Sequence, residues 1–532
     1  HTQDNHNDIH AMVRTPKTDL SMRSRVSVAL LFLVLPEIRG FVANPASRGF
    51  TWHRIVRETS HELHLQNGHD HNPAAADSTD QSVAQFDVEA GRGDGEGNNN
   101  GHAWKELGGK QRSGMFDNVP VQTVSGDGSY TAVLVVPTGI GAAIGGYAGD
   151  ALPVARAVST VVDTLVTHPN VMNGAMLSWP QAGIQYVEGY ALDEFCAGRW
   201  GLLPVTKGGH RIGLVLDCAI EDDLQLRHVQ AANAARATLG INVAEYCVTE
   251  KPAGVTLEMT TGGASWGTVK GLDSLVDAGR RLVEEAGCTA IAVVARFPDD
   301  EDEEALQAYR EGQGVDAVGG AEAIISHVMS QKLKVPCAHA PALPPIDVDE
   351  SVSPRACAEE LGYTFLPCVL SNLHRAPSII TSREHPRAGE ALWADAVDAV
   401  VAPASAFGGA GVLSLAEQAT TLLIAVEDNA TVMKAGAEAL LGGSSSSSSS
   451  SSSVSDRCVT VSSYLEAVGV LACHKAGVNP TCLTPEVPAI RRMPPAPAAA
   501  TEGDVAAAPG GEGRNVGVEE VHSERLRALV DA

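Results

Sequence analysis

Two glycine-rich turns are the most distinctive candidates for ligand binding in this 532-residue sequence. Each follows an apolar run and opens a helical pattern. The first, PTGIGAAIGGYAGD, contains Gly139, Gly141, Gly145 and Gly146. The second, VVAPASAFGGAGVLSLAEQ, contains Gly408, Gly409 and Gly411. Glycine allows backbone N–H groups to approach an anion, and the following helix directs the positive end of its dipole to the same place.

The first turn has neither the spacing of a nicotinamide-binding fingerprint nor the G-K-[ST] ending of a Walker loop. We interpret it as a general anion-binding turn, with close packing of strand against helix as an equal alternative. Two such turns could hold the two ends of one phosphorylated or carboxylated metabolite. For the second turn, a duplication kept for folding alone is an equal alternative.

Two histidines are candidates for acid–base catalysis or metal binding. His168 in THPNVMN and His339 in PCAHAPAL have proline nearby, which indicates rigid loops in which an imidazole could act. His327 in AIISHVM follows an apolar helical pattern and is interpreted as a core histidine. Asn170 and Asn173 could orient a substrate, or form a turn and a helix cap.

Charged residues follow several strand-like runs. Asp217 in LVLDCAI is expected to be a metal or substrate ligand, and Arg296 in VVARF to clamp an anion. Carboxylates beside an anion-binding turn are suited to a Mg²⁺ ion that bridges to phosphate. The acids at 221–223 and 299–300 are more simply explained as helix caps and dipole partners.

The elements that must position these residues form an α/β pattern. Apolar runs of strand length alternate with helical segments such as EDDLQLRHVQAANAARATLG and LDSLVDAGRRLVEEAG, which open on acids and close on glycine. The pattern predicts a mostly parallel sheet with helices on both faces, a Rossmann-like layered architecture over residues 130–486, as one large domain or two intimate lobes. The carboxyl ends of its strands are the expected ligand edge.

Composition narrows the classes of partner. A formal net charge of −26 with no cluster of lysine and arginine argues against binding to nucleic acid or to anionic lipid surfaces. The ten cysteines show no C-x-x-C spacing, which favours a reducing compartment.

The two ends of the chain have the composition of targeting and linking segments. Residues 1–21 are interpreted as untranslated or spurious sequence, and residues 22–40 as a signal peptide that is removed, which leaves no stable membrane insertion in the mature form. Residues 41–128 are expected to be a transit peptide and disordered spacer, 444–453 a poly-serine loop insertion, and 487–532 a disordered tail. This two-part leader resembles those that direct proteins into secondary plastids; plain secretion is the alternative.

Several long motifs carry a family resemblance. PTGIGAAIGGYAGDALPVARA, THPNVMNGAMLSWP, YVEGYALDEF, VVARFPDD, CAHAPAL and EELGYTFLPCVL together resemble domain-of-unknown-function family 3326, uncharacterised proteins of cyanobacteria and plastids. The likeness covers about residues 133–482. It implies a soluble protein of the photosynthetic lineage and transfers no catalytic residue.

The sequence leads to two hypotheses of different classes. The first is an enzyme of small-molecule metabolism in the plastid stroma, which binds a small anionic metabolite at the two turns and uses His168 or His339 as acid or base. The second is a non-catalytic ligand-sensing or assembly factor of the photosynthetic apparatus with the same fold.

Overall fold

A computed structural model describes residues 128–147, 149–173, 183–298, 303–343, 348–362, 365–437, 457–485, 487 and 489–490. All of these fall in one compact unit, Asn99–Ala532. The expected signal peptide, the serine run, and nearly all of the expected spacer and tail lie outside the described residues.

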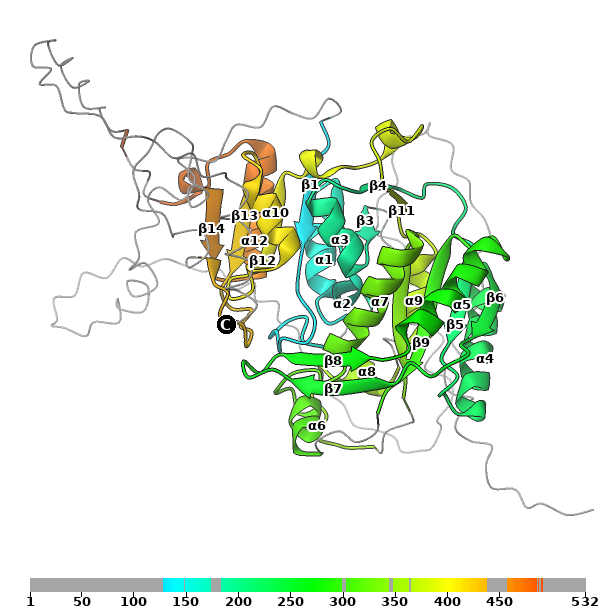
Figure 1. The fold of residues 1–532 in the computed structure, drawn as a ribbon. Coiled ribbons are helices and arrows are strands. Elements are labelled where there is room, and N and C mark those ends of the chain that lie inside the picture. Colours follow the sequence, from blue (N-terminus) through cyan, green and yellow to red (C-terminus); the bar gives the residue numbers. More distant parts are fainter. Residues whose placement is uncertain are drawn as a thin grey trace, which may run out of the picture. The chain divides into compact units, whose positions relative to one another are not determined.

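The larger sheet has six parallel strands in the order β14-β13-β12-β1-β2-β3 (Figure 1). The strands are β1 (Thr131–Leu134), β2 (Thr164–Thr167), β3 (Ile184–Tyr186), β12 (Ala399–Pro403), β13 (Leu422–Val426) and β14 (Cys458–Val461). Strands β1, β12 and β13 are buried along their whole length, as expected for continuous apolar runs covered on both faces.

Helices cover both faces of this sheet. They are α1 (Leu152–Val158), α3 (Gly189–Cys196), α10 (Ala410–Glu417) and α12 (Tyr464–Ala476). Since strand side chains alternate, Ala132 and Leu134 pack in the same buried cluster as α1 and α12, whereas Val133 packs with α3 and α10. A short helix, α2 (Pro169–Met172), follows β2.

The smaller sheet has four parallel strands in the order β10-β9-β5-β6. Its strands and main helices are β5 (Ile212–Leu216), α4 (Asp222–Leu239), β6 (Val243–Val248), α5 (Leu272–Glu284), β9 (Ala290–Arg296), α7 (Gly319–Leu333), β10 (Cys337–Ala342) and α9 (Leu366–Leu373). Helices α5 and α7 pack on one face, and α4 and α9 on the other. Helix α4 begins on two acids and stops at Gly240, whose φ of 69° suits glycine.

Smaller elements complete the described chain. An antiparallel hairpin of β7 (Val255–Met259) and β8 (Ser265–Val269) packs on α7 (Figure 1). The others are α6 (Glu303–Arg310), α8 (Cys357–Glu360) and short 3₁₀ turns at Ala388–Glu390, Ala394–Ala396 and Pro480–Leu483.

The smaller sheet is an insertion into the larger one, because residues 212–342 lie between β3 and β12 in the chain. Strand β4 (Gly201–Leu203), which precedes the insertion, pairs antiparallel with β11 (Ser378–Ile380), which follows it. The His210 N–H donates to the carbonyl of His374 at 3.0 Å. We call these two paired segments, 201–210 and 374–380, the neck.

The two sheets also share apolar packing. One buried cluster contains Leu134 of β1, Leu214 of β5 and Ala338 of β10. The prediction of an α/β fold with mostly parallel strands and helices on both faces is therefore confirmed, in the form of two intimate sheets. Among the described residues, no helix combines the length and the apolarity needed to span a bilayer.

Candidate active site

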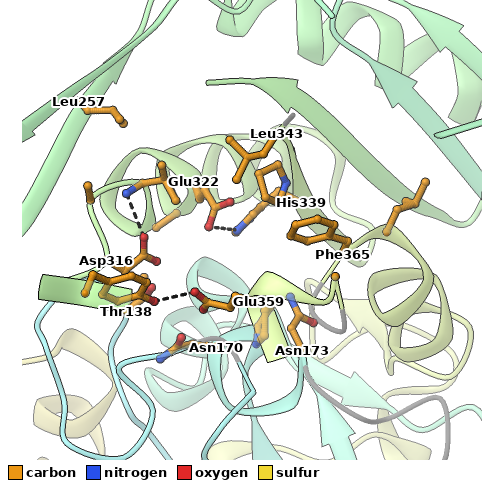
Figure 2. A pocket seen from close by; sticks show the side chains of 18 of the residues that line it. Thr138, Asn170, Asn173, Leu257, Asp316, Glu322, His339, Leu343, Glu359 and Phe365 are labelled. Carbon is orange, nitrogen blue, oxygen red and sulfur yellow. Dashed lines mark hydrogen bonds and ion pairs between the residues drawn. The ribbon is translucent and has the colours of Figure 1, made fainter. Parts of the chain in front are cut away.

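A cavity of about 1290 Å³ lies at the carboxyl ends of strands from both parallel sheets. From the larger sheet it is lined by residues that follow β1, β2 and β3, including Thr138 and Asn170. From the smaller sheet it is lined by α4 and the start of α9, and by Glu322 of α7 and His339 of β10 (Figure 2). This is the edge at which open parallel sheets bind ligands.

His339, one of the two predicted acid–base residues, lies in the cavity wall. It belongs to strand β10 rather than to the loop expected from its prolines, and its Nε2 is 3.3 Å from Glu322 Oε2 in the first turn of α7 (Figure 2). Its Nδ1 is buried and has no hydrogen-bond partner among the described residues. A carboxylate on one ring nitrogen fixes the orientation of an imidazole that acts in acid–base chemistry.

His168, the other predicted acid–base residue, also lines the cavity, directly after β2 and at the start of α2. Its Nε2 accepts a hydrogen bond from the Val136 N–H at 3.0 Å. Burial lowers the pKa of His168 to about 4, with a smaller contribution from His327. The ring is therefore neutral at pH 7, and since Nε2 is the acceptor, Nδ1 carries the hydrogen.

His327 and Glu188 form a second histidine–carboxylate contact that the sequence did not indicate. His327 Nε2 on α7 is 3.3 Å from Glu188 Oε1, which comes directly after β3. The His327 side chain is 42% exposed and lines the cavity, so the interpretation as a core histidine was wrong. The helical periodicity of the sequence placed His327 among apolar neighbours. In the structure, α7 packs against α3 of the larger sheet's layer, and His327 lies at this contact.

The cavity wall is rich in carboxylates. Its acids are Glu188, Glu221, Asp223, Glu258, Asp316, Glu322, Glu359 and Glu360, against the arginines Arg227 and Arg310. Arg310 forms ion pairs with Glu360 at 2.8 Å and with Asp349 at 3.7 Å. Eight carboxylates against two arginines give the cavity a negative potential, which disfavours an anionic ligand.

Part of the wall is apolar. Leu257 of the hairpin, Leu343 after β10 and Phe365 before α9 point toward the cavity from three different elements (Figure 2). Small-molecule pockets commonly combine such apolar surface with a few placed polar groups.

The glycines of the first turn serve close packing. Gly139 has φ of 69°, and a Cβ there would overlap the hydroxyl of Ser265 in the hairpin. The Gly145 N–H donates to Asp150 Oδ1 at 2.6 Å, and a Cβ on Gly146 would overlap the Ala142 carbonyl. None of Gly139, Gly141, Gly145 and Gly146 is among the described residues that line the cavity. The Gly145 amide is bonded to a carboxylate, which argues against an anion site there.

The second turn does not meet the first in the cavity. None of Gly408, Gly409 and Gly411 is among the described lining residues. The Gly411 N–H donates to Asp193 Oδ1 on α3 at 2.9 Å. As at Gly145, the amide N–H is already hydrogen-bonded to a carboxylate of the protein. The two turns therefore do not assemble the expected two-ended anion site.

Asp217 has a structural environment that differs from the metal or substrate ligand expected. It is fully buried, and its Oδ1 accepts hydrogen bonds from the N–H groups of Ala219 and Ala253 at 3.1 and 3.0 Å. Its Oδ2 accepts the Arg296 N–H at 3.2 Å. The carboxylate thus joins the ends of β5 and β9 to the loop before the hairpin. It does not line the cavity.

Arg296, the expected anion clamp, pairs with an acid. Its guanidinium Nη2 is 3.1 Å from Glu221 Oε1, and it also donates to the Phe297 carbonyl. Within the described chain, no group of three or more His, Cys, Asp or Glu residues is placed to hold a metal ion. The expected Mg²⁺ site therefore has no preformed ligand set in this part of the protein.

The residues that line the cavity lie in the part of the chain that is similar to known proteins. A family model described as "Protein of unknown function (DUF3326)" matches residues 131–484. A protein of Synechococcus sp. called an uncharacterized lipoprotein is 51% identical over 357 residues, which cover 67% of this chain and 94% of that relative. No solved structure matches. The matched residues contain both sheets and every described residue of the cavity wall.

Proposed function

This chain belongs to the DUF3326 family of proteins of unknown function, and from the geometry of its cavity we propose that it is an enzyme that performs acid–base chemistry on a small organic molecule. One observation carries the proposal. Two histidine–carboxylate contacts, His339–Glu322 and His327–Glu188, line one cavity at the carboxyl ends of two parallel sheets.

Each histidine would have a distinct part in the reaction. His339 and His327, oriented by their carboxylates, would exchange protons with the bound molecule. His168 stays neutral and would donate a hydrogen bond from Nδ1 to an oxygen of the molecule, because its Nε2 is held by the Val136 amide. Acid–base groups of this kind accelerate reactions by about 10²–10⁴-fold.

The enzyme proposal can be tested without choosing a substrate in advance. The chain is incubated with a metabolite extract of algal or cyanobacterial cells, and the compounds consumed are followed by mass spectrometry. His339→Gln should reduce conversion by at least about 100-fold while the unfolding temperature stays within a few degrees of wild type. The matched control is His385→Gln, an exposed histidine outside the cavity, which should leave conversion unchanged.

The second candidate is a non-catalytic ligand sensor. It is favoured by the His327–Glu188 contact, which joins α7 of the inserted sheet to the start of α3, so a ligand beside it could alter how these elements meet. A ligand that raises the unfolding temperature without being converted, equally in wild type and His339→Gln, would support the sensor and contradict the enzyme.

We also propose that the protein acts in the plastid stroma. The support is the two-part character of the leader, a signal peptide at residues 22–40 followed by a transit peptide and spacer at 41–128, together with the 51% identity to a protein of Synechococcus. A fluorescent protein fused behind residues 22–128 should accumulate inside plastids of a diatom. Fluorescence in the medium or secretory compartments would instead support secretion.

A further inference from the structure

Glu188 is the most deeply buried acid of the cavity wall. Its exposed fraction is 3%. Its Oε2 accepts hydrogen bonds from the N–H groups of Tyr190 and Ala191 at 3.0 and 3.3 Å, which caps the start of α3. Only one of the two carboxylate oxygens is therefore used by the helix.

The other oxygen, Oε1, is buried and accepts no hydrogen bond from the described residues. His327 Nε2 lies 3.3 Å away, within ion-pair distance but outside hydrogen-bond geometry. Buried acceptors are nearly always paired, and an unpaired one is costly. A bound molecule that brings an N–H donor to Oε1 would satisfy it.

The neighbourhood of Glu188 favours a cation. Beside Glu188 the wall is formed by Gly189, the next residue in the chain, and by His327 of α7, whose ring also interacts with that of His168. Neither arginine of the described wall belongs to these elements: Arg227 is on α4, and Arg310 is on α6 in its ion pairs. An ammonium group would therefore meet the Glu188 carboxylate, whereas a carboxylate or phosphate would add to the negative potential of the wall.

Resting on the proposed function, the geometry points to a small organic amine as the substrate class, with its ammonium nitrogen donating to Glu188 Oε1. The apolar part of the molecule lies along the wall formed by Leu257, Leu343 and Phe365. His168 Nδ1–H is then available to an oxygen of the same molecule. No bond is formed or broken in this binding step.

The test compares amines with carboxylates of matched shape. The probes are tryptamine against indole-3-propionate, and pentane-1,5-diamine against glutarate, each titrated to millimolar concentration while the unfolding temperature of the full chain is measured. We expect at least one amine to raise the unfolding temperature and its carboxylate counterpart to leave it unchanged. The inference would be overturned if neither amine raised the unfolding temperature. It would also be overturned if every amine that raised it were matched by its carboxylate counterpart.

A variant locates the effect at Glu188. Glu188→Gln keeps an oxygen to cap α3 but removes the charge, and it should weaken amine binding by about 10- to 100-fold. The matched control is Glu250→Gln, an exposed acid that does not line the cavity, and it should retain wild-type binding. Unchanged amine binding in Glu188→Gln would contradict the assignment. If Glu188→Gln fails to fold, the probe comparison on the wild-type chain decides alone.

The two proposals fail separately. If carboxylate probes bind instead of amines while His339→Gln abolishes conversion of some metabolite, the amine assignment is wrong and the enzyme proposal stands. If amines bind through Glu188 while His339→Gln converts every metabolite as wild type does, the amine assignment stands and the acid–base role of His339 is wrong.

Discussion

The two parallel sheets present their carboxyl ends to one cavity, but they hold their polar side chains differently. In the larger sheet, His168 is bonded to a backbone amide, and Asn170 donates to the carbonyls of Val136 and Gly145. In the smaller sheet, Asp217 is bonded to backbone N–H groups, whereas His339 contacts the Glu322 side chain. A polar group at a strand end is thus available to a ligand only through the atoms that the backbone does not bond.

The largest loss of stability is expected at Asp217, the carboxylate that is hydrogen-bonded to the backbone of the smaller sheet. Asp217→Ala would leave the N–H groups of Ala219, Ala253 and Arg296 without their acceptor in the interior. The free energy of unfolding, measured by urea denaturation, should fall by about 4 kcal/mol or more. The control Asp428→Ala, at an exposed position after β13, should change it by less than about 0.5 kcal/mol. A stable Asp217→Ala chain that loses a Mg²⁺-dependent activity would restore the metal-ligand hypothesis.

The next effect is the pH dependence that His168 gives to the stability of the fold. An unfolded histidine has a pKa near 6.5, whereas burial lowers that of His168 to about 4, so below pH 6.5 the unfolded chain takes up a proton that the folded chain does not. The stability contributed by the neutral ring is complete above pH 6.5 and is lost as the pH falls toward 4, by about 3 kcal/mol.

His168→Gln supplies an amide oxygen in place of Nε2 and removes this titration. Between about pH 7 and pH 4, its free energy of unfolding should fall by about 3 kcal/mol less than that of the wild type. Other buried histidines also titrate with lowered pKa, but both proteins share them. Parallel pH profiles for the two proteins would show that His168 is not held neutral.

The smallest effect compares the two glycine turns. Gly139→Ala would force a side chain into a left-handed conformation and against Ser265, and it should cost about 2 kcal/mol of unfolding free energy. Gly409 has φ of −65° and open space where its Cβ would be, so Gly409→Ala should cost less than about 1 kcal/mol. Similar losses at both positions, measured by thermal unfolding, would contradict the packing role of the first turn.

Much of the fold could be predicted from long apolar runs. They indicate β1, β3, β5, β6, β9, β12 and β13, and the acid-to-glycine pattern indicates α4 and α5. The strands that were missed include β2, which precedes His168, and β10, which contains His339. Strand β2 has only Leu165 and Val166 as apolar residues between two threonines, and β10 contains Pro341, which an edge strand tolerates. The weak strand signal thus led to a wrong loop assignment for His339, whereas His168 does lie in the connection between β2 and α2.

The site itself was predictable only in part. The chemistry of imidazole singled out His168 and His339, and both line the cavity. Their neighbours depended on tertiary contacts that no local pattern contains: Glu188 and His327 are 139 residues apart in the chain (327 − 188). One local signal was present, since Glu188 in YVEGY is an acid directly after an apolar run and before a glycine. The glycine turns were predicted as ligand sites because turns that bind ligands and turns that pack closely both use glycine.

The neck shows how the smaller sheet can be inserted into the chain without disturbing the larger sheet. Leu203 and Ser378 are partners in the two-stranded β4–β11 sheet, so the segment that leads into the insertion and the segment that leaves it lie side by side. A tight reverse turn between them would preserve the order of all six strands and every crossover. The residues between them, 204–377, contain all four strands of the smaller sheet as well as His339, so their removal would leave the strand order of the larger sheet unchanged and would withdraw this half of the pocket.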